Sequence, residues 1–282
     1  MQRIVALVHD SPATEGYGGR SDQEAGPGGS TATPPAIAVG GISTHLVPLG
    51  LMPTSYEELD VRQTTLGELL LRRRIPVSMP GRWIYEVKLD ERFLMSSLVH
   101  DSEDELARLS LEKLEGDQWR VLVGGLGLGY TAAAALNWGQ VESVDVVEFL
   151  PEVIDWHRRD LVPTASTLNS DERCHILQGD CFQFIREQAS GGYDAVLIDI
   201  DDSPEHLLSA SHGSFYSEEG LTQARGALRP GGVFALWTAG EELPHFLERM
   251  RRVFGSVEAE AVEFNNPLHS FEDVNTVYVA QV

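Results

Sequence analysis

Basic residues are scarce in this chain of 282 residues, and their scarcity argues against some classes of binding partner. The sequence has 21 Lys and Arg against 43 Asp and Glu, a formal net charge of −22. A surface this acidic repels phosphate backbones, so we expect no nucleic-acid partner. Cationic ligands such as amines and sulfonium compounds would be attracted, although acidity alone more often serves solubility.

Cysteines and long apolar runs are also few. The two cysteines, Cys174 and Cys181, are too few for a disulfide framework and lack a metal-ligand spacing. The first apolar residues are too few for a signal-peptide core, and no stretch approaches the length of a membrane span. We therefore expect a cytoplasmic protein without membrane association.

The composition divides the chain into three predicted parts. Residues 1–50 are rich in Gly, Pro, Ser, Thr and Ala, which predicts a flexible leader, with a docking motif as the alternative. Residues 51–115 contain short strand patterns broken by Pro and Gly and then a helical pattern, which predicts a small β domain plus one helix. Residues 116–282 form the third part, the predicted ligand-binding and catalytic domain.

In the third part, predicted strands alternate with predicted helices. The strands are expected at residues 121–123, 143–147, 175–177, 195–198 and 233–237. The helices are expected at residues 131–137, 151–158, 182–188, 218–228 and 243–253. This order predicts an α/β fold with a doubly wound, mostly parallel sheet. Two further strands near the C-terminus, without a helix between them, predict a hairpin in which at least one strand runs antiparallel.

A glycine loop follows the first of these strands and contains Gly124, Gly125, Gly127 and Gly129. Glycines allow a sharp turn and a close approach to a ligand, and the next helix offers unpaired amides. The second strand ends at Glu148, whose carboxylate could accept both hydroxyls of a ribose. This combination predicts a nucleoside site; the alternative is a tight turn with a solvated Glu148.

The glycine spacing also indicates which nucleoside would bind. A dinucleotide fingerprint is broken at Tyr130, whereas the G-x-G-x-G pattern suits domains that bind S-adenosylmethionine or similar compounds. Asp180, after the third strand, could accept the adenine amino group. Its alternative role is to cap the following helix.

Three aspartates, Asp199, Asp201 and Asp202, follow the fourth strand at the edge where open α/β sheets bind ligands. Asp199 could orient an amine and take or relay its proton, while Asp202 holds a second cationic end of that substrate. We expect Asp201 to matter least. The alternative is an acidic loop that only caps the next helix.

His206 and His212 follow these aspartates, so a metal site is a competing interpretation of the loop. The spacing matches no familiar ligand motif, and we therefore expect no metal.

The sequence also predicts where three side chains outside these motifs lie. Tyr216 could line the acceptor pocket or equally pack in the core. Met95 is expected in the small β domain's own core. His157 is expected at the surface or behind the site.

From residue 66 to 282 the sequence resembles the spermidine-synthase-like branch of the S-adenosylmethionine-dependent transferase superfamily. The resemblance is carried by the small strands before residue 100, the glycine loop, and the acidic positions Glu148, Asp180, Asp199 and Asp202. It implies a seven-stranded class I methyltransferase (Rossmann-like) sheet behind a small N-terminal β domain. It further implies that Glu148 binds the donor's ribose and Asp180 its adenine. Asp199 and Asp202 would belong to the catalytic loop.

The chain also departs from that family. A loop Asp that helps to hold the donor amine is replaced by Gly127, and the polyamine-gripping Tyr and Gln fall near Ser102 and Leu94. The proline of the catalytic loop is displaced by Ser203.

These features lead to three functional hypotheses. The first is transfer of an aminopropyl group from decarboxylated S-adenosylmethionine to an amine. The second is S-adenosylmethionine-dependent methylation of a small molecule, encouraged by the missing loop Asp. The third is a catalytically inactive nucleoside-binding protein. A homodimer is left open.

Overall fold

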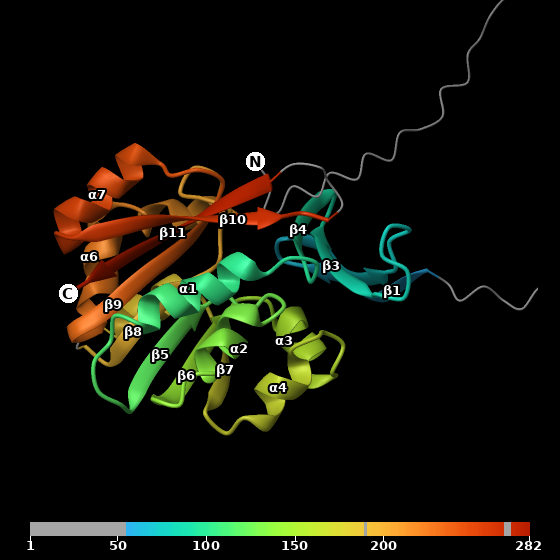
Figure 1. Cartoon of the computed structure of the whole chain (residues 1–282), viewed down its shortest axis with the longest axis horizontal. Helices are drawn as coiled ribbons and strands as arrows, with labels where there is room; N and C mark the ends of the chain where they lie inside the picture. The colour runs from blue at the N-terminus through green and yellow to red at the C-terminus, as the bar shows by residue number, and fades with distance from the viewer. Residues whose placement is uncertain (1–54, 189–190, 268–271) are drawn as a thin grey trace, which may run out of the picture. The chain divides into compact units, whose positions relative to one another are not determined.

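The computed structural model describes residues 55–188, 191–267 and 272–282, which belong to one compact unit (Figure 1). The predicted leader at residues 1–50 lies outside the described residues. None of the helices in the described part of the chain is long and apolar enough to cross a membrane.

The main sheet has seven strands in the order β10-β11-β9-β8-β5-β6-β7 (Figure 1). Its strands are β5 (Trp119–Gly124), β6 (Val141–Glu148), β7 (Cys174–Gln178), β8 (Tyr193–Ile198), β9 (Leu228–Ala239), β10 (Val257–Asn265) and β11 (Glu272–Gln281). β11 runs antiparallel to both of its neighbours, β9 and β10, and the remaining pairs are parallel. The predicted doubly wound sheet and terminal hairpin are therefore confirmed.

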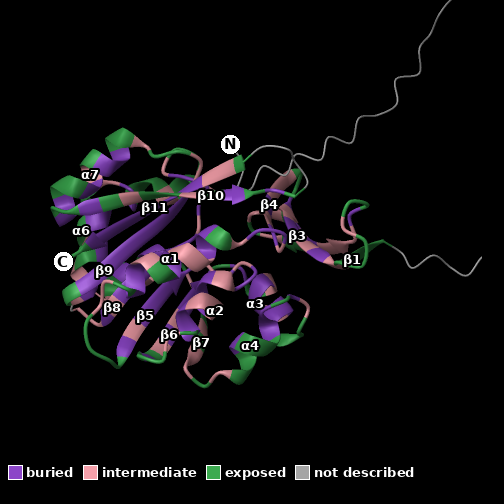
Figure 2. Ribbon diagram, in the orientation of Figure 1, coloured by how far each residue is buried: buried purple, intermediate pink, exposed green. Residues whose placement is uncertain are grey.

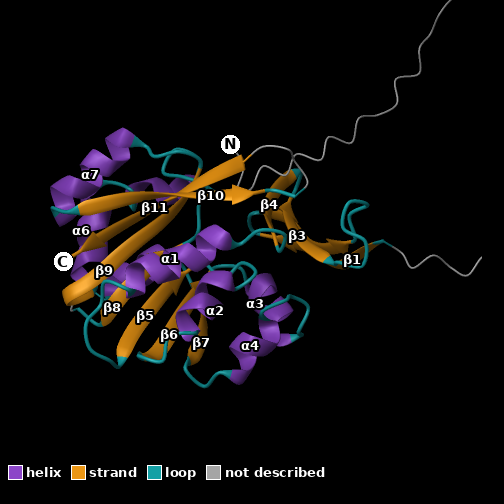
Figure 3. Cartoon of the chain, in the orientation of Figure 1, coloured by secondary structure: helices purple, strands orange, loops and turns teal. Residues whose placement is uncertain are grey.

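Helices cover both faces of this sheet (Figure 3). The helices are α1 (Asp101–Leu111), α2 (Tyr130–Leu136), α3 (Pro151–Arg158), α4 (Ala165–Ser170), α5 (Cys181–Glu187), α6 (Glu218–Gly226) and α7 (Pro244–Phe254). Strand residues alternate between the two faces. Val121 and Val123 join a core with α1 to α4, whereas Leu122 joins a core with α5 to α7. Burial on both faces explains why the central strands β5 and β8 are mostly apolar, and Figure 2 shows them largely buried.

The N-terminal sheet is small and antiparallel. It contains β1 (Tyr56–Thr64), β2 (Gly67–Arg74), β3 (Ile84–Leu89) and β4 (Arg92–Ser96) in sequence order. Leu69, Leu71 and Val87 on its inner face pack into the same core as α1 to α4. The small β domain is confirmed; β1 and α4 were not expected, since β1 is mostly polar and exposed and α4 spans only six residues.

Helix α1 joins the small sheet to the main one, and Leu106 is fully buried on it. Leu106→Ala should lower the free energy of unfolding by about 2–5 kcal/mol, because a cavity would remain between α1 and the sheet. Urea denaturation measures this change. Leu109→Ala is the matched control, since Leu109 is only partly buried on the same helix, and it should cost clearly less. Equal losses in the two variants would contradict the packing of α1 described here.

Candidate active site

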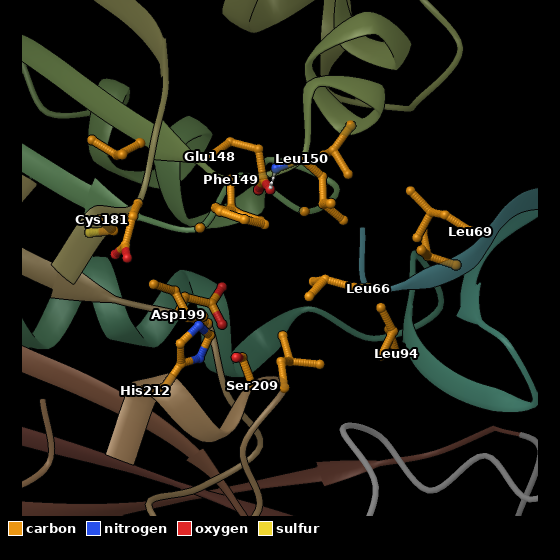
Figure 4. A pocket seen from close by; sticks show the side chains of 18 of the residues that line it. Leu66, Leu69, Leu94, Glu148, Phe149, Leu150, Cys181, Asp199, Ser209 and His212 are labelled. Carbon is orange, nitrogen blue, oxygen red and sulfur yellow. Dashed lines mark hydrogen bonds between the residues drawn. The ribbon is translucent and has the colours of Figure 1, made fainter. Parts of the chain in front are cut away.

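A pocket opens at the carboxyl ends of the central strands, beside the small sheet (Figure 4). Its walls are largely apolar, and leucines of the small sheet contribute to them. Its titratable side chains are the carboxylates of Glu148, Asp180 and Asp199, the thiol of Cys181 and the imidazole of His212. Three of the acidic residues singled out in the sequence therefore meet in one cavity.

The glycine loop is held close to the acidic loop. Gly125 lines the pocket with a φ of +92°, and a β-carbon there would collide with the carbonyl oxygen of Asp199. Gly127 also lines the pocket, whereas Gly124 and Gly129 pack against Cys181 and other side chains behind it. The loop requires glycine for its own packing, so ligand contact by these four glycines stays a prediction.

Glu148 is buried, with 9% of its surface exposed, so the alternative of a solvated side chain is wrong. Its Oε2 accepts a hydrogen bond from the amide of Leu126 at 2.9 Å, and its Oε1 accepts one from the amide of Leu150 at 2.8 Å. The carboxylate thus ties the glycine loop to the residue that precedes α3. Both carboxylate oxygens are therefore fixed by backbone amides at the pocket wall.

Asp180 has the capping role that the sequence offered as the alternative. Its Oδ1 accepts hydrogen bonds from the amides of Phe182 at 2.8 Å and Gln183 at 3.1 Å, at the start of α5. Asp180 also lines the pocket, so capping and ligand contact are compatible. Contact with adenine stays a prediction.

The three aspartates of the acidic loop point to different partners. Asp199 lines the pocket, and its Oδ2 accepts a hydrogen bond from the hydroxyl of Thr131 at 3.0 Å. Asp202 lines a second cavity instead and forms an ion pair with Arg92 of β4. The structure therefore does not bring Asp199 and Asp202 together in one pocket.

Asp201 is 1% exposed and is hydrogen-bonded on both of its carboxylate oxygens. It accepts bonds from the amide of Leu208 at 2.6 Å, the Tyr216 hydroxyl at 2.8 Å and Nδ1 of His212 at 2.9 Å. Our expectation that Asp201 matters least has no support in this geometry. The loop also does not cap the next helices, because Ser209 and Ser217 do so.

Tyr216 is buried in the aromatic core with Phe182 and Phe246 and does not line the pocket. Its core-packing alternative is the one observed, because its hydroxyl is engaged by Asp201. Among the described residues, no group of three or more His, Cys, Asp or Glu side chains is arranged to hold a metal ion.

Comparison with known proteins identifies the family. The family model for the spermine/spermidine synthase domain matches residues 104–262. The chain belongs to the spermine/spermidine synthase domain family. The resemblance seen in the sequence is thereby confirmed.

Individual members of the family are distant. Putrescine N-methyltransferase 4 of Nicotiana tabacum is 26% identical over 185 residues, which cover 56% of this chain and 46% of that protein. Polyamine aminopropyltransferase 2 of Streptomyces coelicolor is 34% identical over 151 residues, covering 52% of this chain and 24% of that protein. The chain thus spans about half the length, or less, of these relatives.

Solved spermidine synthases share the fold. The structure of spermidine synthase with the transition-state analogue AdoDATO matches with a TM-score of 0.64 and 19% identity. The match covers 79% of this chain and 73% of that one.

The structure shows where the residues that depart from the spermine/spermidine synthase pattern lie. Leu94 lines the pocket, whereas Ser102 is buried away from it and hydrogen-bonds to Asn275 at 2.9 Å. Met95 is half-buried, packs against the core that the small sheet shares with α1 to α4, as expected, and also lines the pocket. A β-carbon at Gly127 would lie 2.9 Å from the sulfur of Met95. Met95 therefore occupies the space beside the position where the family has its loop Asp.

Two further side chains line the pocket although the sequence did not predict that they would. Phe149 lines the pocket although 48% of its surface is exposed. Its position directly after Glu148 is the feature of the sequence that could have indicated this. His212 lines the pocket too, and the sequence offered it only as a metal ligand.

His157 lies directly behind the glycine loop and is fully buried, so of its two expected places the surface is excluded. Its Nε2 lies 3.0 Å from the carbonyl oxygen of Gly127 and can donate a hydrogen bond to it. Its Nδ1 is buried without a hydrogen-bond partner among the described residues. Burial lowers the pKa of His157 below its usual 6.5, so the ring is neutral when it supports the loop.

This lowered pKa predicts a pH dependence of stability. Below pH 6.5 the unfolded chain binds a proton at His157 before the folded chain does, so unfolding becomes more favourable as the pH falls. His157→Gln, which can still donate to Gly127, should lose less stability than the wild type between pH 7 and pH 5. Thermal unfolding across that range measures the difference.

His245→Gln is the control for this comparison, because His245 is about half exposed. It should follow the wild type. A His157→Gln profile that parallels the wild type would contradict a neutral, buried His157.

Proposed function

We propose that this chain is a transferase that moves an aminopropyl group from decarboxylated S-adenosylmethionine to the nitrogen of a small amine. The observation that carries the proposal is one largely apolar pocket in which the glycine loop, Glu148, Asp180 and Asp199 meet. Membership of the spermine/spermidine synthase domain family and the polyamine aminopropyltransferase relatives support the same reaction.

The donor nucleoside suits one side of the pocket. Glu148 on the pocket wall would accept hydrogen bonds from the ribose hydroxyls, and Asp180 would accept one from the adenine amino group. The half-exposed ring of Phe149, next to Glu148, would offer an apolar surface to the adenine. These contacts would point the sulfonium toward Asp199.

In this transfer the protein mainly aligns the two substrates, and it forms no covalent intermediate with them. The amine nitrogen attacks the carbon next to the sulfonium in line; the C–N bond forms and the C–S bond breaks, and a neutral thioether leaves. Asp199, partly shielded from water, would orient the cationic amine before attack. The net charge of −22 would raise the local concentration of both cations.

Methyl transfer from S-adenosylmethionine is the second candidate. It is favoured by Gly127, which leaves the loop without the family's carboxylate for the donor amine, and by Met95 beside it. The putrescine N-methyltransferases of tobacco among its relatives support the same alternative.

The reaction products separate these candidates. With both donors and a panel of diamines, aminopropyl transfer should release methylthioadenosine and methyl transfer should release S-adenosylhomocysteine. Chromatography of the nucleoside products makes the distinction. Methylthioadenosine is the expected product; donor binding without either product would mean a nucleoside-binding protein.

Glu148 provides a direct test of donor placement. Glu148→Gln should weaken binding of decarboxylated S-adenosylmethionine and of methylthioadenosine by about 1–3 kcal/mol, because ribose hydroxyls would lose a charged acceptor. Isothermal titration calorimetry measures both affinities. Glu142→Gln, at the exposed opposite end of β6, is the control and should bind as the wild type does. Unchanged affinity in Glu148→Gln would place the ribose elsewhere.

A further inference from the structure

The imidazole of His212 lies on the pocket wall and has no role so far in the proposed reaction. We propose that His212 is a catalytic residue that takes the proton from the acceptor amine, with Asp201 as its positioning residue. This inference rests on the proposed transfer to nitrogen.

The ring of His212 is held from two sides. It lies on the short 3-10 helix η1 (Ala210–Ser214), and its Nδ1 is 2.9 Å from both carboxylate oxygens of Asp201. Its edge packs on Phe182 with ring centroids 5.0 Å apart and an interplanar angle of 81°. Asp201 is itself fixed by Leu208 and Tyr216, so the orientation of the imidazole depends on buried groups.

This arrangement also determines the tautomer. An ionised Asp201 can only accept hydrogen bonds, so the proton of neutral His212 resides on Nδ1. The lone pair on Nε2 is then available, and no described residue hydrogen-bonds to that nitrogen. His212 lines the same pocket as Asp199, and Figure 4 shows the two side chains next to each other on one side of it.

An alkyl ammonium must lose a proton before it can attack. Imidazole changes its charge between pH 5 and 8 and is therefore a better matched base than a carboxylate for this step. The ammonium transfers one proton to Nε2 of His212, the neutral nitrogen attacks the donor carbon, and the electron pair of the broken C–S bond goes to sulfur. The product is a secondary ammonium ion, and His212 then returns its proton to water.

The charges around His212 favour this role. The titratable groups that line the pocket with it are the carboxylates of Glu148, Asp180 and Asp199 and the buried thiol of Cys181, and Asp201 contacts it from behind. These carboxylates make the surroundings of His212 acidic, and an acidic pocket attracts the cationic amine.

His212→Ala, assayed with decarboxylated S-adenosylmethionine and putrescine, tests the inference. We expect kcat to fall about a hundredfold or more, since this is the usual contribution of a positioned general base. The affinity for methylthioadenosine should stay within about twofold of the wild type, and free imidazole should restore part of the lost rate. The acidic limb of the kcat/KM profile against pH should also disappear.

The matched control is His175→Ala. His175 is also paired with an aspartate, at 3.0 Å from Asp145, but lies outside the pocket, and its variant should retain the wild-type rate. A second measurement does not require activity: NMR of the imidazole nitrogens should find the Nδ1–H tautomer in the wild type.

The possible failures are distinguishable. A wild type without turnover, for any pairing of either donor with a diamine, overturns the proposed transfer and this inference with it. An active wild type overturns only the role of His212 if His212→Ala keeps its rate and pH profile, or if imidazole has no effect on a slow variant. An Nε2–H tautomer would overturn it as well.

Discussion

Two backbone amides converge on the buried carboxylate of Glu148, and the geometry of the pocket depends on that contact. One amide belongs to Leu126 in the glycine loop and the other to Leu150 just before α3. A single side chain at the end of β6 therefore holds together the two segments that form the proposed donor side. Because charge-assisted bonds to amides are among the stronger hydrogen bonds, the loop is preorganised before a ligand arrives.

The side chains of the acidic loop, Asp199, Asp201 and Asp202, point in different directions. Its three carboxylates face three different sets of partners. Asp199 lines the pocket, Asp201 turns inward to His212 and Tyr216, and Asp202 is neutralised by Arg92. The pair of Asp202 with Arg92 also links the main domain to the small sheet that closes one side of the pocket.

The small sheet shapes the chemistry that we propose. Leu94 supplies apolar surface near the position where the family has a Gln that contacts the polyamine, and Met95 faces Gly127 of the glycine loop. An acceptor in this pocket would meet fewer hydrogen-bonding groups from the N-terminal side. Recognition of the amine would then rest more on the charges of the main domain, Asp199 above all.

The sequence by itself determined the α/β class, the order of strands and helices, the terminal hairpin and the family. These predictions follow from local patterns in the sequence. Apolar runs indicate buried strands, the glycine spacing indicates the loop, and acidic residues after the strands indicate the binding edge of the sheet. Its ligands, the cytoplasmic location and a homodimer stay predictions. The tertiary structure alone decided which side chains share a cavity. Asp199 and Asp202 are three residues apart yet face different cavities, and His212 lines the site with its ring held between Asp201 and Phe182. Side-chain direction in a loop depends on partners distant in the chain, such as Arg92, and no local pattern encodes them.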